Sequence, residues 1–192
     1  MTTADSTRRA RRAALPAALV ALAALLALAA PALLWAYHLS QAGGLLERGL
    51  SWPSPRQADS LPAVGDERAV AEALAHLEAA RRWRPDHQSA YRLAGQAALA
   101  RRDWAAAARA LDEARARAPR HPLIAWEAGL AYEQLWRAAP SDTQLRERML
   151  EAWRAAGLSG GALLSRAAEA QAAGRDAEAQ IWRERAALLQ SP

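Results

Sequence analysis

Apolar residues follow two different patterns along the chain. Residues 13–37 form one apolar run without a charged side chain. From Asp66 to the C-terminus, apolar residues instead recur three and four positions apart, which is the spacing of one face of a helix. Asp66 is expected to cap the first of these helices, which runs to about Trp83. Residues 38–65 lie between these parts and are rich in glycine and proline, which end helices. The pattern predicts an apolar helix over 13–37, a Gly/Pro-rich linker over 38–65 and an all-α domain over 66–192.

Three apolar positions and a proline recur when 34 is added to their numbers: Ala73, Leu77, Ala80 and Pro85 are followed by Ala107, Leu111, Ala114 and Pro119. A large residue four positions from a small one lies on the same helix face, so a neighbouring helix can approach the small residue closely. Proline ends the second helix of each pair. One such hairpin cannot bury its own apolar face, whereas several stacked hairpins can. The fixed shift therefore predicts a series of stacked, antiparallel helical hairpins.

These positions resemble the tetratricopeptide repeat (TPR), a helical hairpin of about 34 residues. Its eight signature positions are filled here by Tyr91, Ala94, Gly95, Ala98, Ala107, Leu111, Ala114 and Pro119. Most of these are the residue that the family prefers or a similar one, whereas Ala94 and Ala98 are smaller. The resemblance implies a short TPR-like α-solenoid of antiparallel helical hairpins.

The repeat weakens toward the C-terminus. The second copy keeps Ala128, Gly129 and Tyr132 and is then interrupted. Ser141 with Gln144 forms the pattern of a capping box, which predicts that a new helix begins there.

The two ends of the domain also depart from the repeat. The first repeat is expected to lack its first helix, because Pro62 and Gly65 occupy that place. A final hairpin is predicted over residues 161–173 and 177–189, with a turn at Gly174.

The resemblance implies a partner-binding groove, because the first helices of TPR hairpins line a concave surface that takes up peptides or partner helices. By position, the groove residues here are Ser89, Arg92, Gln96, Leu123, Trp126, Leu130 and Glu133. A tryptophan that faces this groove beside Arg92 would be a suitable anchor for a partner. The alternative is that Trp126 packs on a neighbouring helix or on the linker. Three further tryptophans are expected in the core: Trp104, Trp153 and Trp182.

The apolar run is long enough to cross a membrane. Its 25 residues extend about 37 Å as a helix, and a hydrocarbon core of about 30 Å needs about 20 residues. Four arginines precede it within residues 1–12 (Arg8, Arg9, Arg11 and Arg12), and Trp35 and Tyr37 close it, as interfacial aromatic residues do. The positive-inside rule then places the basic N-terminus in the cytoplasm and residues 66–192 outside. The sequence thus predicts a single-pass membrane protein with an extracytoplasmic repeat domain.

Two other interpretations of the apolar run stay open. A cleaved signal peptide fits the basic start and the small residues at 27–29, although the run is longer than the usual 7–15 residues. The pair Arg8-Arg9 also has a weak similarity to a twin-arginine signal. The second alternative is a buried helix of a soluble protein. It would not explain why arginines precede the apolar run and aromatic residues end it.

The predicted linker contains four large apolar residues: Leu45, Leu46, Leu50 and Trp52. They either form a short helical turn on the membrane surface or cover the first repeat hairpin. The sequence favours neither alternative.

The chemistry of the chain gives no sign of catalysis. It has no cysteine, and no phosphate loop, nucleophile elbow or dinucleotide fingerprint. None of the four histidines, His38, His76, His87 and His121, has another ligand at metal-binding spacing. The last two lie 34 residues apart beside the turns between repeats, where we expect a capping or turn role. We expect no enzyme activity, no cofactor and no metal.

Charge does not point to nucleic acid. All 25 basic residues are arginine and the formal net charge is +5, but four arginines lie in residues 1–12. From Asp66 onward, basic and acidic residues are nearly equal in number, so nucleic acid is not an expected partner.

These features favour an interaction scaffold over an enzyme. The leading hypothesis is a membrane-anchored bacterial adaptor that binds an unidentified protein in a TPR-like groove, in cell-envelope assembly. The alternative is a small structural subunit of a larger membrane complex, bioenergetic or polysaccharide-processing. The sequence does not give the oligomeric state.

Overall fold

The computed structural model describes residues 3–51 and 61–190 of the 192-residue chain. For residues 3–19 and 21 it describes the helical backbone and not the side chains. The arginines of residues 1–12 therefore lie outside the described side chains, and Trp52 lies outside the described residues.

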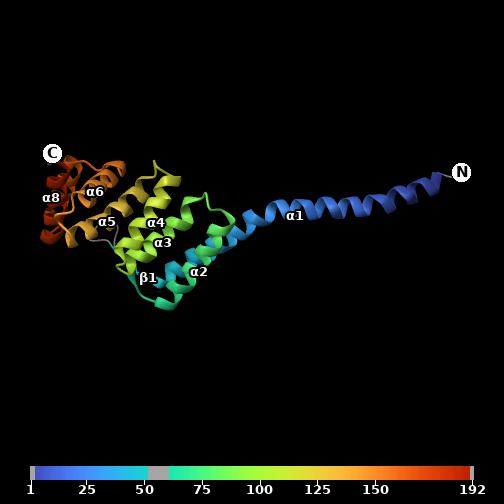
Figure 1. Cartoon of the computed structure of the whole chain (residues 1–192), viewed down its shortest axis with the longest axis horizontal. Coiled ribbons are helices and arrows are strands. Elements are labelled where there is room, and N and C mark those ends of the chain that lie inside the picture. Colours follow the sequence, from blue (N-terminus) through green and yellow to red (C-terminus); the bar gives the residue numbers. More distant parts are fainter. Residues whose placement is uncertain (1–2, 52–60, 191–192) are drawn as a thin grey trace.

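The apolar run belongs to one long helix, α1 (Thr3–Gly49), whose N-terminal part extends away from the rest of the molecule (Figure 1). This helix does not end at residue 37. The prediction of a Gly/Pro-rich linker over 38–65 consequently does not hold for residues 38–49, which are helical. Among the described residues, the stretch Leu22–Gly49 is long and apolar enough to cross a membrane, and a signal sequence near the N-terminus would meet the same criteria.

Burial explains why two glycines do not end α1. Gly43 and Gly44 each cost a helix about 1 kcal/mol relative to alanine. Beside them, Ala42, Leu45 and Leu46 are buried in a cluster with the following helix, and one buried leucine contributes about 1.5–3 kcal/mol. Packing therefore outweighs local propensity.

The C-terminal part of α1 forms the first helix of a complete hairpin with α2 (Glu67–Trp83), so the expectation that the first repeat lacks a first helix is wrong. The two strands β1 (Leu50–Ser51) and β2 (Ala63–Val64) pair antiparallel at the end of this hairpin, with Leu50 opposite Val64. Of the two alternatives for the apolar residues of the linker, packing on the first hairpin agrees with the burial of Leu45, Leu46 and Leu50, although Leu45 and Leu46 belong to the first helix of that hairpin and do not cover it from outside.

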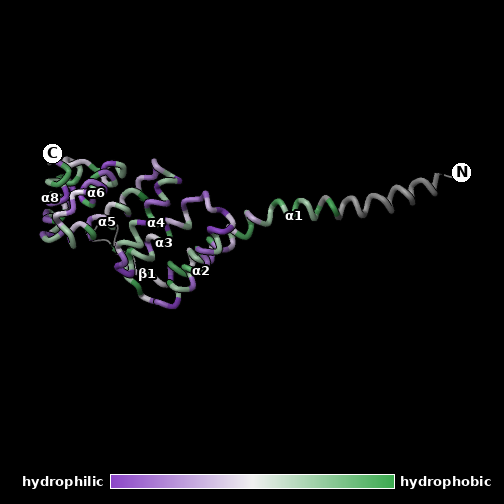
Figure 2. Tube along the Cα trace, in the orientation of Figure 1, coloured by the Kyte–Doolittle hydropathy of each residue, from purple (hydrophilic) through white to green (hydrophobic). Residues whose placement is uncertain are grey.

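Three further hairpins follow, so the all-α fold class is confirmed. In Figure 1 they stack beside the first, and the C-terminus lies at the end of the molecule opposite the N-terminus. Figure 2 shows apolar segments alternating with polar ones through the stack, whereas the coloured stretch of the projecting part of α1 is mainly apolar. The helices are α3 (Gln88–Ala100), α4 (Trp104–Arg117), α5 (Pro122–Ala138), α6 (Thr143–Ala155), α7 (Gly160–Ala172) and α8 (Asp176–Gln190).

Two glycines at equivalent positions of successive repeats mark where the helices of a hairpin approach most closely. A Cβ at Gly95 would lie 2.5 Å from Cγ of Leu111, across the α3–α4 hairpin. A Cβ at Gly129 would lie 2.2 Å from Cδ1 of Trp153, across the α5–α6 hairpin. Both large residues are fully buried. The repeat therefore keeps a contact between a glycine and a large residue while the large residue changes from leucine to tryptophan.

The interrupted repeat contains a different cap from the predicted one. Asp142, not Ser141, precedes α6, and its carboxylate accepts hydrogen bonds from the backbone N–H groups of Gln144 and Leu145 at 2.9 and 3.1 Å. The predicted capping box is thus displaced by one residue. An aspartate can cap a helix on its own, so the side chain of Gln144 is not required for this cap.

Replacing Asp142 by alanine should lower the free energy of unfolding by about 1 kcal/mol, because two backbone donors of α6 lose their acceptor. Urea denaturation followed by circular dichroism measures the change. Ser141→Ala is the matched control and should leave the midpoint unchanged. Equal losses for the two variants would show that Asp142 is not the cap.

Candidate partner-binding groove

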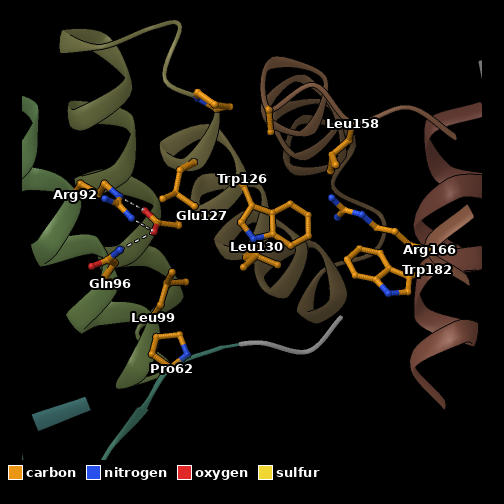
Figure 3. Close-up of a pocket in the computed structure, with 13 residues that line it drawn as sticks. Pro62, Arg92, Gln96, Leu99, Trp126, Glu127, Leu130, Leu158, Arg166 and Trp182 are labelled. Carbon is orange, nitrogen blue, oxygen red and sulfur yellow. Dashed lines mark hydrogen bonds and ion pairs between the residues drawn. The ribbon is translucent and has the colours of Figure 1, made fainter. Parts of the chain in front are cut away.

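An open cavity of about 550 Å³ lies between α3, α5 and the terminal hairpin. Figure 3 shows its lining side chains converging from these elements and from the segment that carries Pro62. Its lining consists of Pro62, Arg92, Gln96, Leu99, Pro122, Leu123, Trp126, Glu127, Leu130, Ala156, Leu158, Arg166 and Trp182. We call this cavity the groove.

The polar side of the groove is a closed ion-pair cluster. Nε and Nη2 of Arg92 donate to the two carboxylate oxygens of Glu127 at 2.9 and 2.8 Å. Nε2 of Gln96 donates to the same carboxylate at 2.6 Å. Glu127 and Gln96 are buried, so this cluster joins α3 to α5 and leaves Arg92 with its charge compensated.

The apolar side is formed mainly by tryptophan and leucine. The rings of Trp126 and Trp182 stack with their centroids 6.0 Å apart. Trp182 is buried and Trp126 is half-buried, so Trp126 both faces the groove and packs on the terminal hairpin. Leu123 is 44% exposed at the start of α5. An exposed leucine beside two large rings gives a ligand apolar area to cover.

One basic side chain of the groove has no carboxylate beside it. Arg166 on α7 is exposed, and its guanidinium carbon lies 5.2 Å from the ring centroid of Trp182. Within the described part of the chain, Arg166 has no ion pair, in contrast to Arg92. The groove therefore combines an apolar surface with one uncompensated positive charge.

The structure brings together five of the seven predicted groove residues: Arg92, Gln96, Leu123, Trp126 and Leu130. Ser89 does not line the groove and lies near the start of α3, where its backbone N–H donates to Nδ1 of His87. Glu133 does not line it either: its carboxylate is bound by Arg185 of α8, and it lies at a separate cavity with Trp136 and Arg137.

Several groove residues were not predicted. Leu158, Arg166 and Trp182 belong to the terminal hairpin or the turn before it, where the repeat pattern is weak. The resemblance assigns groove positions only to the first helices of two repeats. Glu127, which directly follows Trp126, was not predicted either. Its charge on an otherwise apolar helix face was the signal that could have identified it as a groove residue.

Behind the groove, a buried arginine connects the terminal hairpin to α5. Nη2 and Nε of Arg185 donate to Oε2 of Glu133 at 2.7 and 3.1 Å. The guanidinium of Arg185 also lies 5.2–5.7 Å from the ring centroids of Trp126, Trp153 and Trp182. Trp153 and Trp182 are buried, as predicted, and Trp104 is half-buried.

A tyrosine–carboxylate contact lies outside the groove. The hydroxyl of Tyr132 donates to Asp112, and Nη1 of Arg148 donates to the same hydroxyl at 2.9 Å. Burial raises the pKa of Tyr132, and its hydrogen bond to Asp112 raises it further, because both favour the neutral phenol. This contact joins α4, α5 and α6.

The histidines include one pair that the sequence did not suggest. Nδ1 of His38 on α1 and Nδ1 of His76 on α2 are 2.9 Å apart, so the two rings share one hydrogen bond. His87 caps α3 through Nδ1, in agreement with the predicted role beside a turn, and His121 precedes α5 without a side-chain cap. No cluster of three or more possible metal ligands occurs among the described residues.

The fold and the groove define the class of this chain: an all-α protein of stacked, TPR-like helical hairpins. No protein-family model matches the sequence, and no curated protein matches it. Among solved structures, the crystal structure of MamA is similar, with 19% identity, a TM-score of 0.42, and coverage of 62% of this chain and 67% of that one.

Proposed function

We propose that this chain is a membrane-anchored interaction scaffold that takes up a segment of a partner protein in its groove. The open groove, which is lined by two tryptophan rings and an exposed leucine, is the observation that carries the proposal. Concave surfaces of this size with an apolar lining and a few polar groups are typical binding sites. The proposal assigns the chain no catalytic step.

Membrane anchoring is supported by the projecting part of α1. From Val20 to Leu34, the large apolar side chains that the structure describes are exposed; Leu28 is 79% exposed and Leu33 is 61% exposed. A contiguous apolar surface of this kind marks a contact with a membrane or another protein. With the arginines of residues 1–12 on the cytoplasmic side, the stack would lie outside, in agreement with a role in assembling the cell envelope.

Replacing Leu123 by aspartate tests the groove, since it puts a charge on the exposed apolar surface and leaves the buried ion pairs in place. The partner is first identified by crosslinking and affinity purification of the wild-type chain from native membranes. The purified partner should then bind L123D at least about tenfold more weakly, equivalent to about 1.4 kcal/mol, in a direct binding titration.

Leu164 provides the matched control, because it is exposed to a similar degree (46%) but does not line the groove. L164D should bind the partner as the wild-type chain does. If L123D and L164D bind it equally well, the groove is not the binding site. Truncating Trp126 is a less specific test, because its ring also packs against Trp182.

The second candidate function is a structural subunit of a larger membrane complex. The observation that favours it is the exposed apolar face of α1, which could pack against other membrane helices instead of lipid. Purification in a mild detergent distinguishes the structural subunit from the adaptor. A large complex of fixed stoichiometry supports the subunit, and a chain that purifies as a monomer supports the adaptor.

A further inference from the structure

The geometry of the first hairpin fixes how close the helical stack lies to the projecting part of α1. At one end of the hairpin, the backbone N–H groups of Gly65 and Asp66 donate to the carbonyl oxygen of Gly49 at 2.8 and 3.1 Å. From there α2 returns antiparallel to α1. At about 1.5 Å per residue, the seventeen residues of α2 bring Trp83 back to about the level of residue 32 on α1.

Side-chain contacts confirm this level. The ring centroids of Trp35 on α1 and His87, which precedes α3, are 4.6 Å apart. The guanidinium carbon of Arg84 lies 5.0 Å from the ring centroid of Trp35. The turn between α2 and α3 therefore contacts α1 at Trp35, directly after the exposed Leu33 and Leu34. Within the described residues, no flexible segment separates the projecting part of α1 from the helical stack.

Aromatic and basic side chains gather at this end of the stack. Tyr37 is 55% exposed and Trp83 is 42% exposed, and Trp35 is half-buried against Arg84 and His87 of the turn. Arg82 is well exposed, and its ion pair with Glu78 is equally exposed and therefore weak. We call Trp35, Tyr37, Arg82, Trp83 and Arg84 the collar.

We propose that the collar is a lipid-binding surface that lies in the phospholipid headgroup region and seats the first hairpin directly on the bilayer. This inference rests on the proposed function in one respect, namely that α1 spans the membrane. About 20 residues of helix cross a hydrocarbon core of about 30 Å. Counted from residue 13, the first after the basic segment, that core ends near residue 32, which is the level of Trp83.

The bilayer interface is the partner that fits the residues of the collar. Tryptophan and tyrosine are enriched at the headgroup level because their rings are apolar and their N–H or O–H groups are polar. Arginine side chains lay their apolar stems on apolar surface and hold the charged group among phosphates. The collar presents both residue types beside an exposed apolar helix, whereas an aqueous surface would leave Trp83 and Tyr37 in water.

The absence of cysteine from the chain allows the collar to be tested with single labels. Trp83→Cys and Arg82→Cys place an environment-sensitive fluorophore in the collar. Leu26→Cys places it on the projecting helix, and Leu164→Cys on α7 provides an aqueous control of similar exposure to Trp83. The full-length chain is reconstituted in nanodiscs of phosphatidylcholine and phosphatidylglycerol. Quenching is measured with iodide in water and with a quencher attached to the lipid headgroup.

We expect labels at positions 82 and 83 to be quenched by the headgroup-attached quencher, and to be quenched about fivefold less by iodide than the label at 164. The label at 26 should resist iodide altogether. Circular dichroism confirms that each labelled chain is folded, and position 82 decides the question if the change at 83 disturbs folding.

The outcomes distinguish a failure of the collar proposal from a failure of the proposed membrane anchor. If the label at 26 resists iodide while labels at 82 and 83 are as accessible as that at 164, α1 spans the bilayer and the collar proposal is wrong. If the label at 26 is accessible to iodide, or is shielded only when another protein is present, the anchor and the collar are both overturned.

Discussion

Replacing Glu133 by alanine should lower the free energy of unfolding by about 3–5 kcal/mol, because it removes the carboxylate to which the buried guanidinium of Arg185 donates. Arg185 is 2% exposed and Glu133 is 1% exposed, so both members of the pair are buried in the folded chain. Chemical denaturation followed by tryptophan fluorescence and circular dichroism measures the loss. The exposed pair of Glu78 and Arg82 is the control, and Glu78→Ala should cost less than about 1 kcal/mol.

The double variant E133L/R185L distinguishes a lost charge pair from lost packing. Apolar residues in place of a buried ion pair are often neutral or stabilising, so the double variant should recover most of the stability that E133A loses. A loss below about 1 kcal/mol for E133A, or a double variant as unstable as the single one, would contradict this account.

The E133A variant should destabilise the terminal hairpin first. Among the described residues, α7 and α8 make close backbone contacts mainly with each other, so side chains such as Arg185 and Trp182 connect them to the stack. In E133A, amide hydrogen exchange should accelerate in α7 and α8 before it does in α3 and α4. Such local opening would also open the groove on the side of Arg166 and Trp182.

Replacing Gly129 by alanine is the second change with a large expected effect. The new Cβ would overlap the indole of Trp153, which is fully buried and rigid. Overpacking of a core costs about 1–3 kcal/mol or more, and the gain in helix propensity offsets about 1 kcal/mol. We expect a net loss of about 2 kcal/mol in the free energy of unfolding, measured by urea denaturation.

Gly43 serves as the control for this experiment, because it is also inside a helix but a Cβ there would meet nothing within 4 Å. Gly43→Ala should therefore leave the chain unchanged or stabilise it by about 0.5–1 kcal/mol. G129A combined with Trp153→Leu should be less destabilised than the sum of the two single changes, because the smaller side chain relieves the overlap. Additive losses would contradict a direct contact between the two residues.

The sequence predicted the helical hairpins where the repeat pattern is strong. Gly95, Leu111 and Pro119 identified the α3–α4 hairpin, and Asp66 was correctly expected to cap α2. These successes depend on local signals, namely a cap, a spacing on one helix face and a proline. The groove followed from the same pattern, since Arg92 and Trp126 occupy equivalent positions of successive repeats and both line it.

The errors arose where distant contacts override local propensity. Gly43 and Gly44 suggested a break in α1, but the burial of Leu46 against α2 keeps the helix intact. Glu133 was placed in the groove by analogy between repeats, whereas the irregular repeat brings Arg185 of α8 against it. A pairing between residues 52 positions apart is not encoded in any spacing that a single sequence displays.

If α1 spans a membrane, as we propose, its unbroken course has a mechanical consequence. A flexible tether would let the repeat domain sample many orientations, but α1 enters the first hairpin without a joint, so helix and stack turn as one lever. Transmembrane helices tilt by about 20° on average, and bilayer thickness changes that tilt. The direction in which the groove opens would then depend on the thickness of the membrane beneath it.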